Sequence, residues 1–187
     1  MLFPGHTEEH RAQGALLHFL CMIDSSANTD LIPEVLQVND LPLADLHSLL
    51  ARYALQLQLV PNDTPIPGSF WGDPEAGVIG STVYVRSDTP VHSLLHEACH
   101  LIVLPPERRA LVHTDASDSV LEEDATCYLQ IVLADELDGV GRERLMADMD
   151  AWGYSFRLGS ARAWFEHDAE DARHWLLQRG LLPAHAA

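Results

Sequence analysis

The sequence predicts an α+β fold in which helices pack around a small sheet. Apolar residues recur at helical spacing in both halves of the chain. Short alternating or β-branched segments gather between residues 55 and 86, and Pro and Gly are frequent from 61 to 90. With 187 residues, 47% of them hydrophobic, the chain can bury a core of its own. We therefore expect residues 1–187 to form a single domain.

The N-terminal half contains two predicted helices, followed by the predicted strands. Helical periodicity extends over Glu8–Ile23 and over Leu43–Gln56, which begins directly after a proline. The alternation in Leu55–Val60 predicts a strand that ends at the next proline. Gly77–Gly80 and Ser81–Arg86 are typical of two short strands, and together they predict a hairpin.

The C-terminal half is predicted to be helical. Pro90–Leu104 begins with a residue that favours helix starts and is followed by two prolines that stop the helix. Ser119–Ala134 begins with a hydroxyl that can cap a helix, and acidic residues follow in its first turn. Two further helices are predicted at Arg142–Trp152 and at Ser160–Arg179, the latter closed by glycine.

Acidic residues far outnumber basic ones. The chain has 28 Asp and Glu against 11 Lys and Arg, a formal net charge of −17. Such a surface cannot neutralise phosphates, so we expect no nucleic acid and no membrane as partner. The apolar run Ala15–Ile23 is too short to cross a bilayer, and it lacks the basic start of a signal peptide.

The three cysteines, Cys21, Cys99 and Cys127, are odd in number and widely spaced. This pattern does not fit a disulfide framework, and a reducing cytoplasm is the expected setting. We interpret Cys99 and Cys127 as small buried hydrophobic residues.

One apolar segment, VHSLLHEACHLIVL at residues 91–104, carries His92, His96 and His100 at intervals of four. This spacing returns to the same face of a helix, so the imidazoles lie one turn apart. The sequence from His96 to His100 reads His-Glu-x-x-His, in which two imidazoles can reach one tetrahedral zinc ion. Glu97 is then placed to take a proton from the water that the zinc activates. His92 is expected at the rim of the site or next to the ligands.

The next predicted helix opens with Glu122 and Glu123, either of which can supply a third ligand. Two histidines and a glutamate leave one coordination position for water, as in catalytic zinc sites. Both groups also have interpretations without a metal. Acidic residues at a helix start complement the helix dipole, and buried histidines can hydrogen-bond to neighbouring groups. The combination of the helical motif with downstream acidic residues favours bound Zn2+.

The segment Pro90–Ala134, with LHEACHL, PPERR and EEDAT in this order, resembles the glutamate-zincin metallopeptidases. It is most similar to small bacterial proteins of the ImmA/IrrE-like kind. The resemblance implies a zincin-like core with a small twisted sheet, an active-site helix beneath it and a cleft between them. Relatives often have Gly in place of Cys99, and Asn or Asp in place of Thr126. The pattern of the smaller relatives favours Glu123 as third ligand, with Glu122 as the alternative.

The predicted function is that of a zinc-dependent metallopeptidase, a hydrolase that cleaves peptide bonds of a protein or peptide substrate. In this hypothesis an edge strand near Ser81–Arg86 binds the substrate backbone by strand addition. The alternative is a non-enzymatic regulatory or partner-binding protein on a zincin scaffold. The sequence leaves the identity of the substrate and the oligomeric state open.

Overall fold

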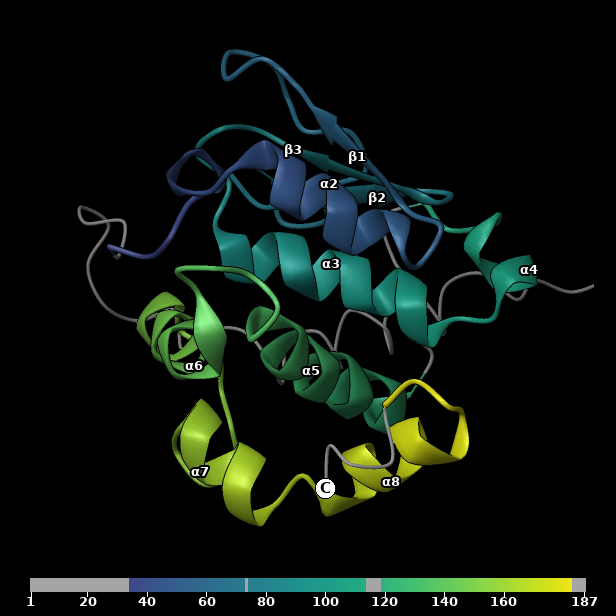
Figure 1. The fold of residues 1–187 in the computed structure, drawn as a ribbon, viewed down its shortest axis with the longest axis vertical. Helices are drawn as coiled ribbons and strands as arrows, with labels where there is room; N and C mark the ends of the chain where they lie inside the picture. Colours follow the sequence, from purple (N-terminus) through teal and green to yellow (C-terminus); the bar gives the residue numbers. More distant parts are fainter. Residues whose placement is uncertain (1–33, 73, 114–118, 183–187) are drawn as a thin grey trace, which may run out of the picture.

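The computed structural model describes residues 34–72, 74–113 and 119–182. The helix predicted at Glu8–Ile23, together with Cys21, lies outside these described residues. Within them, the chain forms seven α-helices and a 3-stranded mixed sheet (Figure 1). This arrangement confirms the α+β class.

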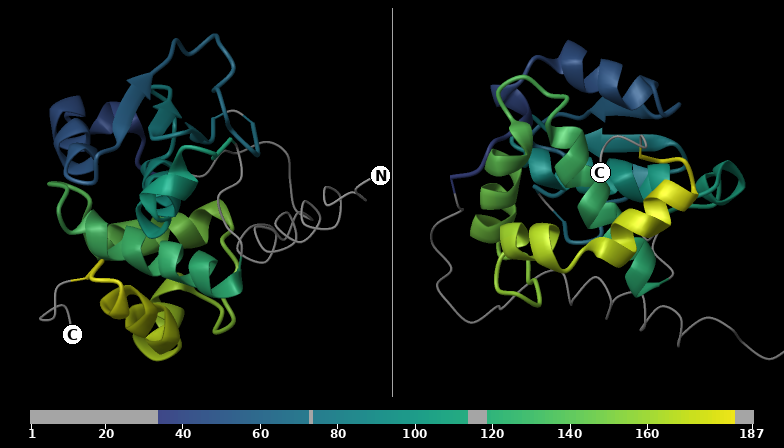
Figure 2. Two further views of the ribbon diagram at one scale, coloured as in Figure 1. Left: turned by 90° about the vertical axis from the view of Figure 1, so that its right-hand side faces the viewer. Right: turned by 60° about the horizontal axis from the view of Figure 1, so that its bottom comes forward.

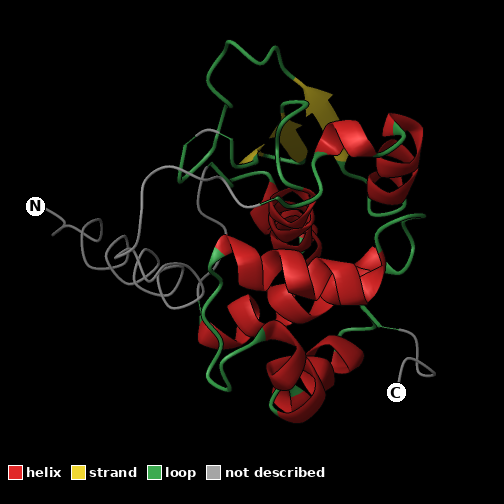
Figure 3. Ribbon diagram, turned by 90° about the vertical axis from the view of Figure 1, so that its left-hand side faces the viewer, coloured by secondary structure: helices red, strands yellow, loops and turns green. Residues whose placement is uncertain are grey.

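The strands lie together at one end of the described part of the molecule, and helices make up most of the rest (Figure 3). In chain order the elements are η1 (Val38–Asp40, a 3-10 helix), α2 (Leu43–Ala51), β1 (Gln56–Leu59), β2 (Gly77–Ile79), β3 (Thr82–Val85), α3 (Val91–Val103), α4 (Pro106–Arg109), α5 (Val120–Ala134), α6 (Gly141–Trp152), α7 (Ala161–His167) and α8 (Glu170–Gln178).

The sheet has the strand order β1-β3-β2, with β1 parallel and β2 antiparallel to β3. The predicted hairpin is confirmed: β2 and β3 pair directly, and Gly80 at their turn has a positive φ of 59°. The expectation that Ser81–Arg86 supplies an edge strand is wrong, because β3 has a hydrogen-bonded neighbour on each side. Residue alternation indicates which face of a strand is buried, but it does not determine the strand's neighbours.

The outer side of β2 is approached closely by the preceding loop. Gly77 forms a bridge with Ser69, and a Cβ atom at Gly77 would lie 2.3 Å from the backbone oxygen of Pro67. Glycine is therefore required where this loop passes β2. At the other end of β2, Ile79 forms a bridge with His113.

Helix α3 lies in the middle of the molecule, between the sheet and α5 (Figure 1). It packs against β2 and β3 on one side and against α5 on the other, and every residue from Val91 to Val103 is buried. Helix α8 packs against the side of α5 that faces away from the sheet (Figure 2). The polar side chains of α3 therefore face other protein groups, where buried polar atoms require partners.

The predicted starts of the two central helices are confirmed. Pro90 directly precedes α3, and the Ser119 hydroxyl oxygen accepts a 3.2 Å hydrogen bond from the backbone N–H of Glu122 at the start of α5. Helix α6 also lies where it was predicted, and it ends at Gly153 with a left-handed φ of 103°.

The single helix predicted at Ser160–Arg179 is wrong, because the chain forms two helices, α7 and α8, with a break at Asp168. Asp168 has a φ of −138°, outside the helical region. Its carboxylate accepts a 2.8 Å hydrogen bond from Nε of Arg157, a residue that lies before α7. This contact with a preceding loop is not visible in helical periodicity.

Two other predicted boundaries also change. The helix predicted at Leu43–Gln56 ends at Ala51, and Ala54 then adopts a positive φ of 57° before the chain enters β1. The two prolines that end α3 also begin the short helix α4. In the described part of the chain, no helix has the length and apolar character needed to span a membrane.

Candidate metal centre

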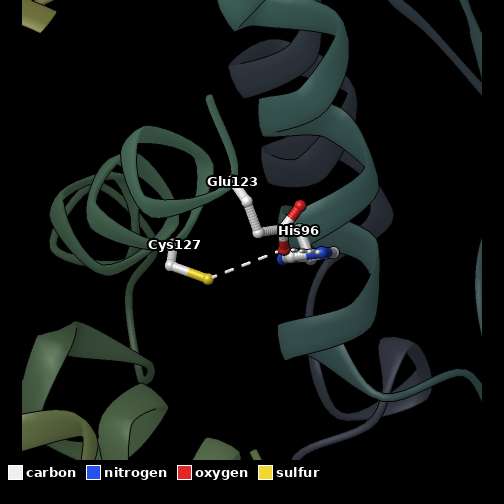
Figure 4. Close-up of side chains that lie close together, drawn as sticks. All are labelled: His96, Glu123 and Cys127. Atoms are coloured by element: carbon white, nitrogen blue, oxygen red, sulfur yellow. Dashed lines mark hydrogen bonds and ion pairs between the residues drawn. The ribbon is translucent and has the colours of Figure 1, made fainter. Parts of the chain in front are cut away.

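Helices α3 and α5 bring three of the predicted ligands together. Nε2 of His96 lies 3.0 Å from Nε2 of His100 and 3.3 Å from Oε1 of Glu123. Nε2 of His100 lies 3.5 Å from Oε2 of Glu123. All three side chains are buried, and Figure 4 shows His96 and Glu123 pointing toward each other from the two helices.

The other nitrogen of each imidazole is also engaged by α5. Nδ1 of His96 lies 2.9 Å from Oε1 of Gln130, and Nδ1 of His100 lies 3.4 Å from Oγ1 of Thr126. An amide oxygen can only accept, so the bond to Gln130 requires a proton on Nδ1 of His96. In neutral His96, the lone pair of Nε2 then faces His100 and Glu123.

This geometry places electron-rich atoms against one another in a buried space. Two imidazole nitrogens and a carboxylate lie within 3.5 Å of one another, and they require a proton or a metal cation between them. His96, Glu123 and Cys127 form a buried group whose ligand atoms all lie within 4.8 Å of one another, and this group can hold a metal ion.

The side chains of α5 that approach the histidines of α3 lie on one face of α5. Glu123, Thr126, Cys127 and Gln130 are spaced at i, i+3, i+4 and i+7, so all four point toward α3. Gln130 has no predicted role, and Thr126 was identified only as a departure from the pattern of the resembling family. The periodicity that starts at Glu123 was the signal that could have identified both residues.

Glu122 points to a different environment. Its Oε1 forms a 3.2 Å ion pair with Nη1 of Arg108. It lines a cavity of about 400 Å³ beside α4, whereas Glu123 lines a separate cavity at the start of α5. The side chains of the two neighbouring glutamates therefore point into different surroundings, as expected from the rotation of about 100° per residue in a helix.

Glu97 and His92 both lie on α3, and both are buried. Glu97 follows His96 directly and is 7% exposed. His92 is fully buried against the rings of Trp152 and Tyr154. Of its two predicted places, the rim is therefore wrong, and a position next to the proposed ligands agrees with the contact of Tyr154 with both His92 and His96. Neither ring nitrogen of His92 has a hydrogen-bond partner among the described residues. Burial, followed by the charge of His96, lowers the pKa of His92 to about 3.

Tyr154 connects these histidines to the segment after α6. Its ring lies edge-on to His96 at 5.8 Å and to His92 at 5.4 Å, measured between ring centroids. This tyrosine has no predicted role, because nothing in its local sequence relates it to α3.

The two described cysteines are both buried, as predicted, but they differ in surroundings. Burial raises the pKa of the Cys99 thiol well above its ordinary value. Cys127 instead lies near the ligand group, with Sγ 4.0 Å from Oε1 of Glu123. Its interpretation as a simple hydrophobic residue is therefore incomplete.

A cavity of about 550 Å³ opens beside Glu123. Its walls come from the start of α5, from residues 155–157, from α7 and from the start of α8. Phe156 and Trp164 contribute apolar surface, and Asp124 contributes a carboxylate. Burial, followed by the negative charge of Glu123, raises the pKa of Asp124 to about 6. The cavity provides space for a ligand next to the group that can hold a metal ion.

Comparison of the chain with protein-family models, with curated proteins and with solved structures found no match.

Proposed function

We propose that this protein is a zinc-dependent metallopeptidase that hydrolyses peptide bonds of a protein or peptide substrate in the cytoplasm. In this proposal His96, His100 and Glu123 hold the zinc, and Glu97 is the general base. Helices α3 and α5 with the small sheet correspond to the zincin-like core, and the helices after α5 form its C-terminal part.

The observation that carries the proposal is the orientation of the two imidazoles. Each Nδ1 atom is engaged by a side chain of α5, and each Nε2 atom lies within 3.5 Å of Glu123. Metal-binding histidines typically have one nitrogen on the metal and the other hydrogen-bonded to the protein. A chance cluster of buried histidines has no reason to adopt this pattern twice.

The distances also fit zinc. Zinc bonds of about 2.0–2.2 Å to nitrogen and oxygen, in a tetrahedron, separate neighbouring ligand atoms by about 3.3–3.6 Å. The three separations in the site are 3.0, 3.3 and 3.5 Å. Small side-chain adjustments are therefore enough to complete the coordination.

Each residue has a defined task in hydrolysis. Bound zinc supplies a Lewis acid that polarises a carbonyl group and makes water more acidic. Glu97 accepts a proton from the attacking water and delivers it to the leaving amine. Gln130 and Thr126 hold the two imidazoles in position. The cavity beside Glu123 accommodates a substrate side chain next to the bond that is cleaved.

One observation favours the second candidate, a regulatory or partner-binding protein with a structural metal. The three proposed ligands are at most 3% exposed, and structural zinc sites are closed to solvent. In such a protein the metal would hold α3 to α5, and Glu97 would have no chemical role.

The experiment compares metal content and proteolysis in the parent, Glu97→Gln and Glu107→Gln. Glu107 is an exposed glutamate on α4 and serves as the matched control. We expect stoichiometric zinc in all three, and cleavage of casein or a cytoplasmic substrate by the parent and Glu107→Gln alone. Retained cleavage in Glu97→Gln would refute the proposed enzymatic mechanism, and absence of zinc after loading would refute the proposed metal site. A Glu97→Gln trap can then identify the substrate by pull-down.

A further inference from the structure

Cys127 lies one helical turn after Glu123, on the face of α5 that contacts α3. Its Sγ is 4.0 Å from Oε1 of Glu123, and the ligand atoms of His96, Glu123 and Cys127 all lie within 4.8 Å of one another. Figure 4 shows the sulfur directed from α5 into the space between the helices, toward the other two side chains. Cys127 is completely buried, so this sulfur faces the site and not solvent.

The position suits a zinc ligand. A zinc–sulfur bond of about 2.3 Å places the sulfur about 3.6 Å from a neighbouring nitrogen or oxygen ligand in a tetrahedron. The sulfur of Cys127 is 4.0 Å from the nearest carboxylate oxygen of Glu123. The ligand atoms of His96 and Cys127 lie within 4.8 Å of each other. The sulfur must therefore move by about 0.4 Å toward Glu123 and by up to about 1.2 Å toward His96, and rotation of the cysteine side chain can provide such a shift.

We propose that Cys127 is the fourth protein ligand of this metal, so that the site is closed and latent at rest. On metal binding, the thiol S–H bond would break and a sulfur–metal bond would form, and the proton would leave with water released by the hydrated ion, with no change in oxidation state. A catalytic zinc site needs a position for water. Withdrawal of the sulfur provides that position, so Cys127 controls whether the site can act on a substrate. This inference rests on the proposed metallopeptidase function and adds a regulatory step to it.

The test uses cobalt, which replaces zinc and reports sulfur coordination by its absorption spectrum. The full chain is loaded with Co2+ as the parent, as Cys127→Ser and as Cys99→Ala. Cys99 is the other buried cysteine on the described helices and serves as the matched control. We expect a sulfur-to-cobalt charge-transfer band in the parent and in Cys99→Ala. In Cys127→Ser this band should be lost while the ligand-field bands of cobalt remain.

Peptide hydrolysis by the zinc-loaded proteins gives a second measurement. The parent cleaves substrate only while the sulfur is withdrawn. Latency therefore predicts faster cleavage by Cys127→Ser than by the parent, because the serine hydroxyl is a poor zinc ligand and leaves room for water. If Cys127→Ser does not fold, X-ray absorption of the zinc-loaded parent must still detect one sulfur neighbour.

Two results overturn the inference, and they separate it from the proposed function. Stoichiometric cobalt without a sulfur band in the parent shows that Cys127 is not a ligand, and the histidine and glutamate site remains. If the parent binds neither cobalt nor zinc, the metal site itself fails and the inference fails with it.

Discussion

Gln130 determines which ring nitrogen of neutral His96 carries the proton, and replacing Gln130 by leucine tests this role. The glutamine is fully buried on α5, and its Oε1 lies 2.9 Å from Nδ1 of His96. Its amide nitrogen donates to Sδ of Met149 at 2.9 Å, which holds the amide in the orientation that presents the oxygen to the histidine. Gln130→Leu keeps a similar volume but removes the acceptor. The N–H of His96 then faces an apolar group.

The size of the effect follows from two independent considerations. Loss of a partner behind a metal-binding histidine typically weakens metal affinity by about 10–100-fold, which corresponds to about 1.4–2.7 kcal/mol. A buried donor left without an acceptor costs about 1–3 kcal/mol. The two ranges overlap, so we expect the zinc affinity of Gln130→Leu to fall by about 10–100-fold.

The assay is zinc titration of the metal-free protein in competition with a chromophoric chelator at fixed pH. Gln130→Glu retains an acceptor for His96 and should bind zinc at least as tightly as the parent. Met149→Leu removes the sulfur partner of the amide but leaves its oxygen in place, so its affinity should stay close to the parental value. If folded Gln130→Leu binds zinc with parental affinity, Gln130 does not support the metal site and the reasoning is wrong.

Four further outcomes are expected. In the same titration, Glu123→Ala should lose most of its zinc affinity, whereas Glu122→Ala should retain it. Glu122→Ala should act mainly on the helix start and lower the free energy of unfolding by about 1 kcal/mol or less. The reverse order of zinc affinities would make Glu122 the ligand. Glu97→Gln should retain zinc, measured by atomic absorption, while peptide hydrolysis falls by roughly 10²–10⁴-fold. Arg109 donates to three backbone carbonyl groups, so Arg109→Met should lower the free energy of urea unfolding by about 1–3 kcal/mol; an unchanged midpoint would contradict this. Burial raises the pKa of Glu75 above its ordinary value of 4.5. The folded protein therefore binds this proton more tightly than the unfolded chain, and the free energy of unfolding falls as the pH rises from 4.5 through the pKa of the folded state. Glu75→Gln should remove this dependence in unfolding measured across that range, and an unchanged pH slope would count against it.

Local sequence was sufficient for the helices that carry the site. Pro90 and Ser119 correctly predict where α3 and α5 begin, because helix starts depend on groups within one turn. The spacing of His96 and His100 likewise predicts their common face, since it follows from helix geometry alone. These features need no knowledge of the rest of the fold.

Features that depend on distant contacts were not predictable. The break between α7 and α8 follows from the bond between Asp168 and Arg157, and the central place of β3 follows from its pairing with β1. Adjacent glutamates at a helix start have the same propensity and charge. The difference between Glu122 and Glu123 therefore appears when the partners Arg108, His96 and His100 are in place.

Most of the wall of the cavity beside Glu123 comes from a different stretch of the chain than the proposed ligands. The ligands and their supporting side chains lie between residues 96 and 130, whereas most of the cavity wall lies between residues 155 and 172. The proposed ligands and most of the cavity wall thus belong to separate segments of the chain. Substitutions in the later segment can change the shape of the cavity while leaving the contacts among His96, His100 and Glu123 intact. In the proposed metallopeptidase, such substitutions would change the preferred substrate without changing the residues proposed to carry out hydrolysis.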